Sequence, residues 1–367
     1  MSAVLGDPIL RHASEQSECR VSIIIKALNE EQRICDTIES ALRAVAAVGG
    51  EVILADSCST DRTVELARSY PIQIVQLAYS DDRCCGVGPQ LGYQHSRGEF
   101  VYILDGDMQL LDGFLQKALA FMTKRPAVAG VGGRIVEKNT ESLEYVSRAD
   151  RIWASSVPCR VDRLDGGGLY RRSAIEDAGY FSDRNLHSYE ELDLATRLLA
   201  LRWELWRLPT DVATHFGHDA PPYHLLMRRW RSGYILGLGE LVRAAWGQDR
   251  LVHVVSLHEL RLYVAVLGWW LILMSVPFWS ISVTERLASF MVLSVAPLLA
   301  MTWRKRSLTK ALYSLVSWCF NAAGLVRGLM RPRRPVREAI ASQILQESAH
   351  LPASLAHLSP KVRVASV

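Results

Sequence analysis

Two aspartates, Asp105 and Asp107, stand one glycine apart directly after the apolar run FVYIL at residues 100–104. Two carboxylates at this spacing can both bend towards one cation, and Mg²⁺ or Mn²⁺ suits a site built from carboxylate and phosphate oxygens. The same residue types are also ordinary in an acidic turn. The pair is a candidate metal site if other polar side chains gather beside it.

Polar residues also follow two earlier apolar runs. Asn29, Glu30 and Glu31 come after VSIIIK, and Asp56 comes directly after EVILA. At a strand end, Asp56 can accept hydrogen bonds from a base or ribose, or it can cap the turn that follows at 59–61. Glu30 and Glu31 fit the electrostatic preference for acids at a helix N-terminus.

The elements that must position these residues follow from hydrophobic patterning. The runs at 21–26, 51–55, 72–77 and 100–104 are apolar almost throughout, which is typical of strands buried on both faces. Segments with helical spacing separate them. This alternation predicts an α/β fold with a doubly wound, mostly parallel sheet. Ligands of such sheets bind at the carboxyl ends of the strands, where Asn29, Asp56 and the aspartate pair all fall.

Composition restricts the partners and the compartment. The formal net charge of +4 gives no indication of a nucleic-acid partner. Seven scattered cysteines, without CxxC or zinc spacing, indicate reduced thiols. Residues 1–20 have neither a basic start nor a long apolar core, so we expect no export signal and a cytoplasmic first half.

The C-terminal third is apolar enough to enter a membrane. Residues 262–282 carry no charge and 287–303 form a shorter second candidate span. The basic residues 304–306 place the end of that hairpin in the cytoplasm by the positive-inside rule. Residues 308–330 are expected to form an amphipathic helix in the membrane interface, with a third span as the alternative. A buried helical subdomain is the alternative for the whole region.

Five ordered motifs make the chain resemble glycosyltransferase family 2, which has the GT-A nucleotide-sugar fold. They are VSIIIKALNEE, EVILADSCSTDRT, RGEFVYILDGDMQL, GGGLYRRSAIEDAGYF and YEELDLATRL. The resemblance covers about residues 21–247. It implies a transferase that moves a sugar from a nucleoside-diphosphate donor to an acceptor with inversion.

The resemblance also implies roles on the donor side. Ala27, Asn29 and Asp56 would line the nucleotide pocket, Asp105 would sit near the ribose or the metal, and Asp107 would ligate Mg²⁺ or Mn²⁺ at the diphosphate. A divalent cation stabilises the charge that the leaving diphosphate gains.

On the acceptor side, Glu191 matches the general base of the family, with Glu190 as the fallback. The acceptor hydroxyl must lose its proton as it attacks, and a carboxylate can accept it. Taken without the resemblance, both glutamates are ordinary first-turn charges of a helix. Gly167 and Gly168 belong to the loop that would border the acceptor.

The sequence departs from the family pattern in several places. Lys26 stands where the family often has proline, and Cys58 where its turn usually has glycine. The segment 88–92 lacks the usual arginine near the phosphates, for which Arg83 is a possible substitute. These departures affect nucleotide contacts more than the type of reaction.

The segment from His215 onward contributes further candidates. His215 follows a strand where related enzymes often place a histidine that faces metal or phosphate, and a surface or capping role is the alternative. LMRRW partly resembles the QxxRW of membrane polysaccharide synthases, although Leu226 replaces the glutamine. Arg229 and Trp230 are therefore acceptor-side candidates, or else residues of an interfacial helix.

We therefore expect an N-terminal tail at 1–20, a transferase domain at 21–247 with an interfacial helix near 222–246, a membrane region at 248–330, and a basic tail at 331–367. The expected enzyme adds single sugars to a lipid-linked or glycan acceptor, in contact with membrane lipid. It would act at the cytoplasmic face of the inner membrane, in the synthesis of cell-surface polysaccharide or glycolipid. The alternatives are a processive polysaccharide synthase, a sugar nucleotidyltransferase and a non-catalytic scaffold that kept the fold.

Overall fold

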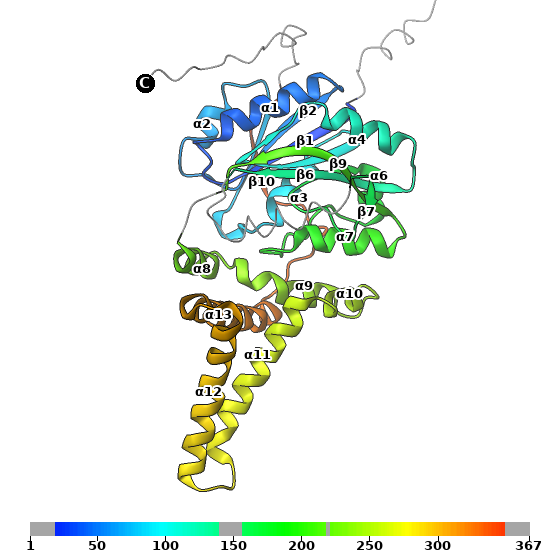
Figure 1. Ribbon diagram of the computed structural model, residues 1–367. Helices are drawn as coiled ribbons and strands as arrows, with labels where there is room; N and C mark the ends of the chain where they lie inside the picture. The colour runs from blue at the N-terminus through cyan, green and yellow to red at the C-terminus, as the bar shows by residue number, and fades with distance from the viewer. Residues whose placement is uncertain (1–18, 139–155, 218–220, 349–367) are drawn as a thin grey trace, which may run out of the picture.

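The structure is a computed structural model that describes residues 19–138, 156–217 and 221–348. An α/β domain lies at one end, and a long helical hairpin projects away from it (Figure 1). The expected N-terminal tail lies almost entirely outside the described residues, as does the far end of the expected C-terminal tail.

One sheet organises the α/β domain, and its strands follow the order β10-β3-β2-β1-β4-β8-β6-β9-β5, with β7 paired to β9. The strands are β1 Val21–Ala27, β2 Gly50–Asp56, β3 Gln73–Leu77, β4 Phe100–Asp105, β5 Met108–Leu110, β6 Val128–Glu137, β7 Cys159–Arg160, β8 Leu169–Arg171, β9 Glu204–His215 and β10 Ser342–Gln346. Strands β3, β2, β1 and β4 are parallel, whereas β8 runs antiparallel to both β4 and β6. The predicted α/β fold is confirmed, with a mixed sheet in place of a mostly parallel one.

Both faces of the parallel half are covered, which explains the continuous apolar runs. In β1, Ile23 and Ile25 pack into one core and Ile24 packs into the other, and all three are fully buried. The helices that contribute to the first core are α1 Ile34–Ala46, α2 Thr63–Ala67 and α4 Phe114–Thr123. The helices that contribute to the second are α3 Val87–Gln94, α6 Arg172–Asp177 and α7 Glu190–Ala200. A short 3₁₀ turn, η2, spans Ser80–Asp82.

Short helices connect the sheet domain to the hairpin. They are α8 Pro222–Arg231, η3 Tyr234–Leu236, α9 Gly237–Ala245 and α10 Leu251–Val255. The hairpin follows, built from α11 His258–Ser275, η4 Val276–Phe278 and α12 Val283–Lys305. A capping box between Ser282 and Glu285 begins α12.

The hairpin consists of two helices long and apolar enough to cross a membrane, His258–Phe278 and Val283–Lys305. Only 17% and 6% of their most apolar windows are buried within the protein. A buried core helix would be covered by its own chain, and these two are not. The low burial therefore argues against the alternative of a buried helical subdomain.

Helix α13, Leu308–Met330, lies across the base of the hairpin beneath the sheet domain (Figure 1). Its polar residue Ser314 is buried, while Leu308 and Leu312 are 59% and 46% exposed. The buried side of α13 also contains Ala311, Ala322 and Leu325, and Lys310 is exposed, so the two sides do not divide cleanly into apolar and polar. The amphipathic helix in the membrane interface stays a prediction.

After α13 the chain returns to the sheet. Ile340 is buried, and β10 pairs antiparallel with β3, so it closes that edge of the sheet. The basic tail predicted for residues 331–367 therefore contains a strand of the sheet, which hydrophobic patterning did not predict.

Candidate active site

Three parallel strands bring the predicted polar residues to one edge. Ala27 pairs in register with Asp56, and Lys26 pairs with Asp105. The ends of β1, β2 and β4 therefore meet, as expected for a doubly wound sheet. Ala27, Asp56 and Asp105 share this edge.

Gly106, between the two aspartates, is required by close packing. A Cβ atom there would lie 2.8 Å from Cγ of Glu30 and 3.3 Å from Cβ of Ala27. Its backbone is not left-handed, so packing and not a strained turn requires the glycine. It lets the loop between β4 and β5 lie against the end of β1.

The two aspartates have different partners. Lys26 Nζ lies 3.0 Å from Oδ1 of Asp105. Asp107 Oδ2 instead lies 3.2 Å from Nε2 of His215, and Nδ1 of His215 lies 2.5 Å from Glu137. Strand pairing explains the second set, because His215 is in register with both Met108 and Glu137.

Charge around His215 changes its protonation. Burial acts to lower its pKa, but the hydrogen bonds and charges of Asp107 and Glu137 raise the pKa to about 10. The imidazole of His215 is thus a cation between two carboxylates.

A divalent cation would be held by Asp107, because the protonated His215 has no free nitrogen for a metal. His215 was predicted as a metal ligand, and this protonation does not fit that role. Within the ranges that the structure describes, no group of three or more His, Cys, Asp or Glu side chains is arranged to hold a metal ion. Mg²⁺ and similar ions are commonly held by one or two protein groups plus substrate phosphates. Asp107 fits such a partial site, whereas Asp105 forms an ion pair with Lys26.

Asp56 holds the loop that follows β2, residues 57–61, which is the candidate nucleotide loop. Its Oδ2 accepts hydrogen bonds from the Ser59 amide at 3.0 Å and from Gln76 Nε2 at 2.8 Å. Its Oδ1 is buried and has no hydrogen-bond partner among the described residues. Oδ2 therefore caps the turn, as one of the two alternatives predicts, and the nucleotide-binding role of Asp56 stays a prediction that the unpartnered Oδ1 allows.

Asn29 and Cys58 complete this loop. Asn29 Oδ1 accepts a hydrogen bond from the Thr60 amide at 2.8 Å, which joins the loop after β1 to the loop after β2. Cys58 has a left-handed backbone with φ 59°. This explains why a glycine is usual at its position, because non-glycine residues adopt that region at a cost.

Arg83 contacts the same loop, donating a hydrogen bond to the carbonyl oxygen of Cys58. Its Nε is buried without a hydrogen-bond partner among the described residues. Arg83 thus lies beside the candidate nucleotide pocket, and it also lines a cavity on the membrane side.

Glu191 lies at the start of α7, opposite the sheet edge. Its carboxylate accepts hydrogen bonds from the Gly166 and Gly167 amides at 3.1 and 3.0 Å. Burial raises the pKa of Glu191 to about 7, while Lys26 acts to lower it and Glu190 acts to raise it. A carboxylate with a pKa near neutrality is well matched to a general base.

Lys26 connects the two sides of the site. Its Nζ lies 3.4 Å from Oε1 of Glu190 as well as 3.0 Å from Asp105. Burial lowers the pKa of Lys26, but Asp105, Glu190 and Glu191 raise it more, so the ammonium stays charged. The lysine that replaces the usual proline is thus a fixed positive charge at the centre of the site.

The glycines of the acceptor loop have a steric explanation. Gly167 has φ +104°, and a Cβ atom there would lie 2.5 Å from the carbonyl oxygen of Ile103. The loop can therefore press against β4 and present its amides to Glu191. A cavity of about 20 Å³ lies between Lys26, Glu190, Glu191 and this loop, room for about one water-sized group.

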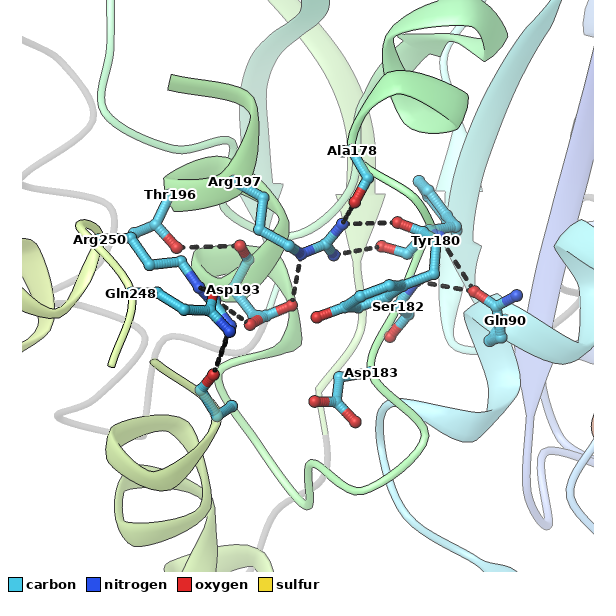
Figure 2. Close-up of polar contacts among 12 residues, drawn as sticks. Gln90, Ala178, Tyr180, Ser182, Asp183, Asp193, Thr196, Arg197, Gln248 and Arg250 are labelled. Carbon is cyan, nitrogen blue, oxygen red and sulfur yellow. Dashed lines mark hydrogen bonds and ion pairs between the residues drawn. The ribbon is translucent and has the colours of Figure 1, made fainter. Parts of the chain in front are cut away.

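A buried ion network anchors α7 (Figure 2). Asp193, with no exposed surface, accepts a hydrogen bond from Arg197 Nε at 2.9 Å and another from Arg250. Arg197 also donates to the carbonyl oxygens of Ala178, Tyr180 and Phe181.

These are the aspartate and arginine of the YEELDLATRL motif, and our sequence analysis gave them no role. The signal available was their i, i+4 spacing on one helix. The partner Arg250 lies 57 residues from Asp193, so its contribution could not be read from the sequence.

The membrane-side candidates contact other helices. The guanidinium of Arg229 lies 5.2 Å from the ring centroid of Tyr234, and Trp230 packs edge-on against Phe320 of α13 at 5.2 Å. Trp230 also lines a cavity of about 580 Å³ between the sheet domain and α13.

Comparison with known proteins first defines the fold class. The structure is similar to the mannosyltransferase PcManGT from Pyrobaculum calidifontis, solved with GDP-Man and Mn²⁺, with a TM-score of 0.54 and 18% identity over 86% of this chain and 88% of that one. This is a GT-A fold. Residues 22–178 match the family model for glycosyl transferase family 2.

Three relatives align in sequence with part of this chain. The succinoglycan biosynthesis protein ExoO of Rhizobium meliloti is 30% identical over 145 residues, 39% of this chain and 40% of the relative. A probable glucomannan 4-beta-mannosyltransferase of rice is 28% identical over 147 residues, 37% of this chain and 25% of the relative. The putative glycosyltransferase EpsE of Bacillus subtilis is 29% identical over 199 residues, 48% of this chain and 66% of the relative. The matches thus span a quarter to two thirds of these relatives.

Proposed function

We propose that this chain is a membrane-anchored, metal-dependent, inverting glycosyltransferase. It moves one sugar from a nucleoside-diphosphate donor to a lipid-linked or glycan acceptor at the cytoplasmic face of the inner membrane. The observation that carries the proposal is the position of Glu191, which two loop amides hold next to Glu190. Lys26 in turn contacts both Glu190 and the donor-side acid Asp105.

The transfer step uses groups of the chain itself. Glu191 accepts the proton of the acceptor hydroxyl as its oxygen attacks the anomeric carbon, and the bond from that carbon to the diphosphate breaks. Asp56 receives a donor N–H or O–H at its free oxygen, which orients the nucleotide. Asp107 would hold a divalent cation, which would supply charge stabilisation to the diphosphate beside the positive charge of His215.

Three features support the proposed membrane location, the role in polysaccharide or glycolipid synthesis, and the addition of single sugars. Two apolar helices are exposed, and basic residues 304–306 follow the second, as expected for a cytoplasmic end. ExoO acts in succinoglycan biosynthesis, according to its description, which supports a role in cell-surface polysaccharide or glycolipid synthesis. Two spans favour single additions over processive synthesis, because they offer no obvious export channel.

The test is donor turnover by the full-length protein with Mg²⁺ or Mn²⁺, comparing wild type with Asp107→Ala and Glu191→Gln. Each variant should lose at least about a hundredfold in kcat, within the range for removal of a general base. Glu65→Gln on the exposed face of α2 is the matched control and should retain activity. Undiminished turnover in both site variants would reject the assignment.

The sugar nucleotidyltransferase alternative predicts release of inorganic diphosphate from a nucleoside triphosphate and a sugar phosphate. The match of residues 22–178 to the family model for glycosyl transferase family 2 disfavours it. Metal-dependent binding of a nucleotide sugar, measured by calorimetry, separates an active transferase from a non-catalytic scaffold.

A further inference from the structure

A large charged cavity lies apart from Glu191, at the junction between the sheet domain and helices α8 and α13. Its volume is about 580 Å³. Arg83 lines it from the sheet domain, Trp230 and Arg231 from α8, and Arg327, Met330 and Arg331 from the end of α13.

Positive charge dominates this cavity. Four arginines line it, against the single acidic residue Asp81. Arg331 is partly neutralised by Glu240, at 3.8 Å. Arg231 and Arg327 have no ion pair or hydrogen bond from their side chains within the described residues, although Arg327 lies 4.7 Å over the ring of Trp230. Guanidinium groups bind phosphate with paired hydrogen bonds, so the cavity suits a phosphate or diphosphate group.

The cavity also has an apolar side that a soluble anion would not need. Trp230 and Met330 line it, and Met330 is 76% exposed. Leu329 and Val326, on the same last turns of α13, are 38% and 37% exposed. The other end of α13, where Leu308 and Leu312 are exposed, lies at the base of the hairpin (Figure 1). A ligand with a phosphate head and a long apolar tail would satisfy both parts.

The position of the cavity indicates an acceptor lipid and not a structural phospholipid. Arg83 reaches from it to the carbonyl of Cys58 in the candidate nucleotide loop. His187, which also lines it, stands four residues before Glu191 in the chain. A structural phospholipid has no reason to lie beside both the candidate nucleotide loop and the segment before Glu191. A lipid-linked acceptor does, because its reacting group must reach both the donor and Glu191.

We propose that this cavity binds the phosphate of a lipid-linked acceptor, with the lipid tail leaving along α13. This inference rests on the proposed transferase function and names its acceptor class. It also moves Arg83 from the donor side, where the sequence placed it, to the boundary between donor and acceptor.

The experiment measures lipid binding without any sugar donor, so its result does not depend on turnover. Full-length protein in phosphatidylcholine nanodiscs is titrated with a polyprenyl phosphate and followed by native mass spectrometry. Arg231→Gln and Arg327→Gln should each weaken binding about tenfold, the loss expected for one charged hydrogen bond. Arg228→Gln and Arg304→Gln, exposed arginines outside the cavity on α8 and α12, are the matched controls and should bind like wild type.

Two further ligands identify the source of the phosphate. The uncharged polyprenol of the same length should not bind, and phosphatidylglycerol should show no binding that depends on Arg231 or Arg327. Equal binding of polyprenol, or wild-type affinity in both cavity variants, would overturn the proposal. Loss of phosphatidylglycerol binding in the same variants would also overturn it, since the cavity would then be a general headgroup site.

Misfolding is separated from lost binding by a conservative substitution. Arg327→Lys keeps the charge and should recover part of the affinity that Arg327→Gln loses. Equal loss in both variants, with a lowered melting temperature, would assign Arg327 a structural role and reject it as a ligand contact.

Discussion

At the scale of single residues, Lys26 is the centre of the candidate site. It contacts Asp105 on the donor side and Glu190 on the acceptor side, and its charge opposes the rise in the pKa of Glu191. A proline at this position could do none of this. The departure from the family pattern therefore has an electrostatic consequence at the proposed base.

This arrangement predicts the pH dependence of the reaction. Because the pKa of Glu191 is about 7, kcat/KM should fall about tenfold per pH unit below neutrality as the base becomes protonated. Lys26→Gln removes a charge that favours the carboxylate, so this acid limb should move to higher pH. The measurement is a pH profile of kcat/KM for both proteins.

Lys117→Gln, an exposed lysine on α4, serves as the control and should leave the acid limb in place. An acid limb that does not move in Lys26→Gln would show that Lys26 does not act on the base.

Much of the site could be predicted from sequence, because short motifs carry it. Asp56, Asp105, Asp107 and Glu191 each stand beside a recognisable strand or helix start. The contacts of His215 could not be predicted, because they depend on the pairing of β9 with β5 and β6. Strand pairing across 78 residues leaves no local pattern.

At the scale of elements, α7 is the part whose position matters most, because Glu190 and Glu191 form its first turn. Asp193 anchors the helix, because it is buried and accepts hydrogen bonds from Arg197 and Arg250 (Figure 2). Burial acts to raise the pKa of Asp193, but the two arginines lower it below its ordinary value. The stability contributed by this network is present above the ordinary carboxyl pKa and is lost as the pH falls through the lowered one.

Breaking the network should destabilise the domain. Asp193→Asn leaves two buried arginines without a counter-charge, which costs about 3–5 kcal/mol. We expect a lower apparent melting temperature for the full-length protein in detergent, measured by thermal unfolding. Asp162→Asn, an exposed aspartate on the loop between β7 and β8, is the control. Equal melting of Asp193→Asn and wild type would contradict the anchoring role.

Elements differ in how well their sequences predict them. The first four strands are long apolar runs, and hydrophobic patterning alone predicts them. Strand β10 has five residues, SQILQ, with only two apolar side chains. Its partner β3 lies more than 260 residues earlier in the chain. A short polar strand at an edge is defined by the partner that it covers, which explains why sequence patterning missed it.

At the scale of the whole molecule, the chain leaves the sheet after β9, forms the membrane-side helices, and returns as β10 (Figure 1). Gln94 exchanges hydrogen bonds with the backbone of Ile340 at 2.8 and 3.0 Å. Arg333 pairs with Asp183 at 2.5 Å, and Arg334 pairs with Asp82 at 2.7 Å. The basic segment expected to be a tail is thus a connection between the helices and the sheet.

A pair of isoleucines tests this connection. Ile340 is 2% exposed and Ile344 is 48% exposed. Ile340→Ala should cost about 2–5 kcal/mol through the cavity it creates, whereas Ile344→Ala should change stability by about 0.5 kcal/mol or less. Thermal unfolding of the full-length variants measures the difference. Equal effects of the two substitutions would show that the return of the chain does not contribute to the core.

The return of the chain to β3 also sets an order for biosynthesis. During translation, β3 emerges early, but the strand that covers its edge is made only after both apolar helices. An exposed strand edge is a template for pairing with other chains. The nascent domain therefore keeps an open edge at β3 until both apolar helices have been made, and the sheet is completed only by the last described strand of the chain.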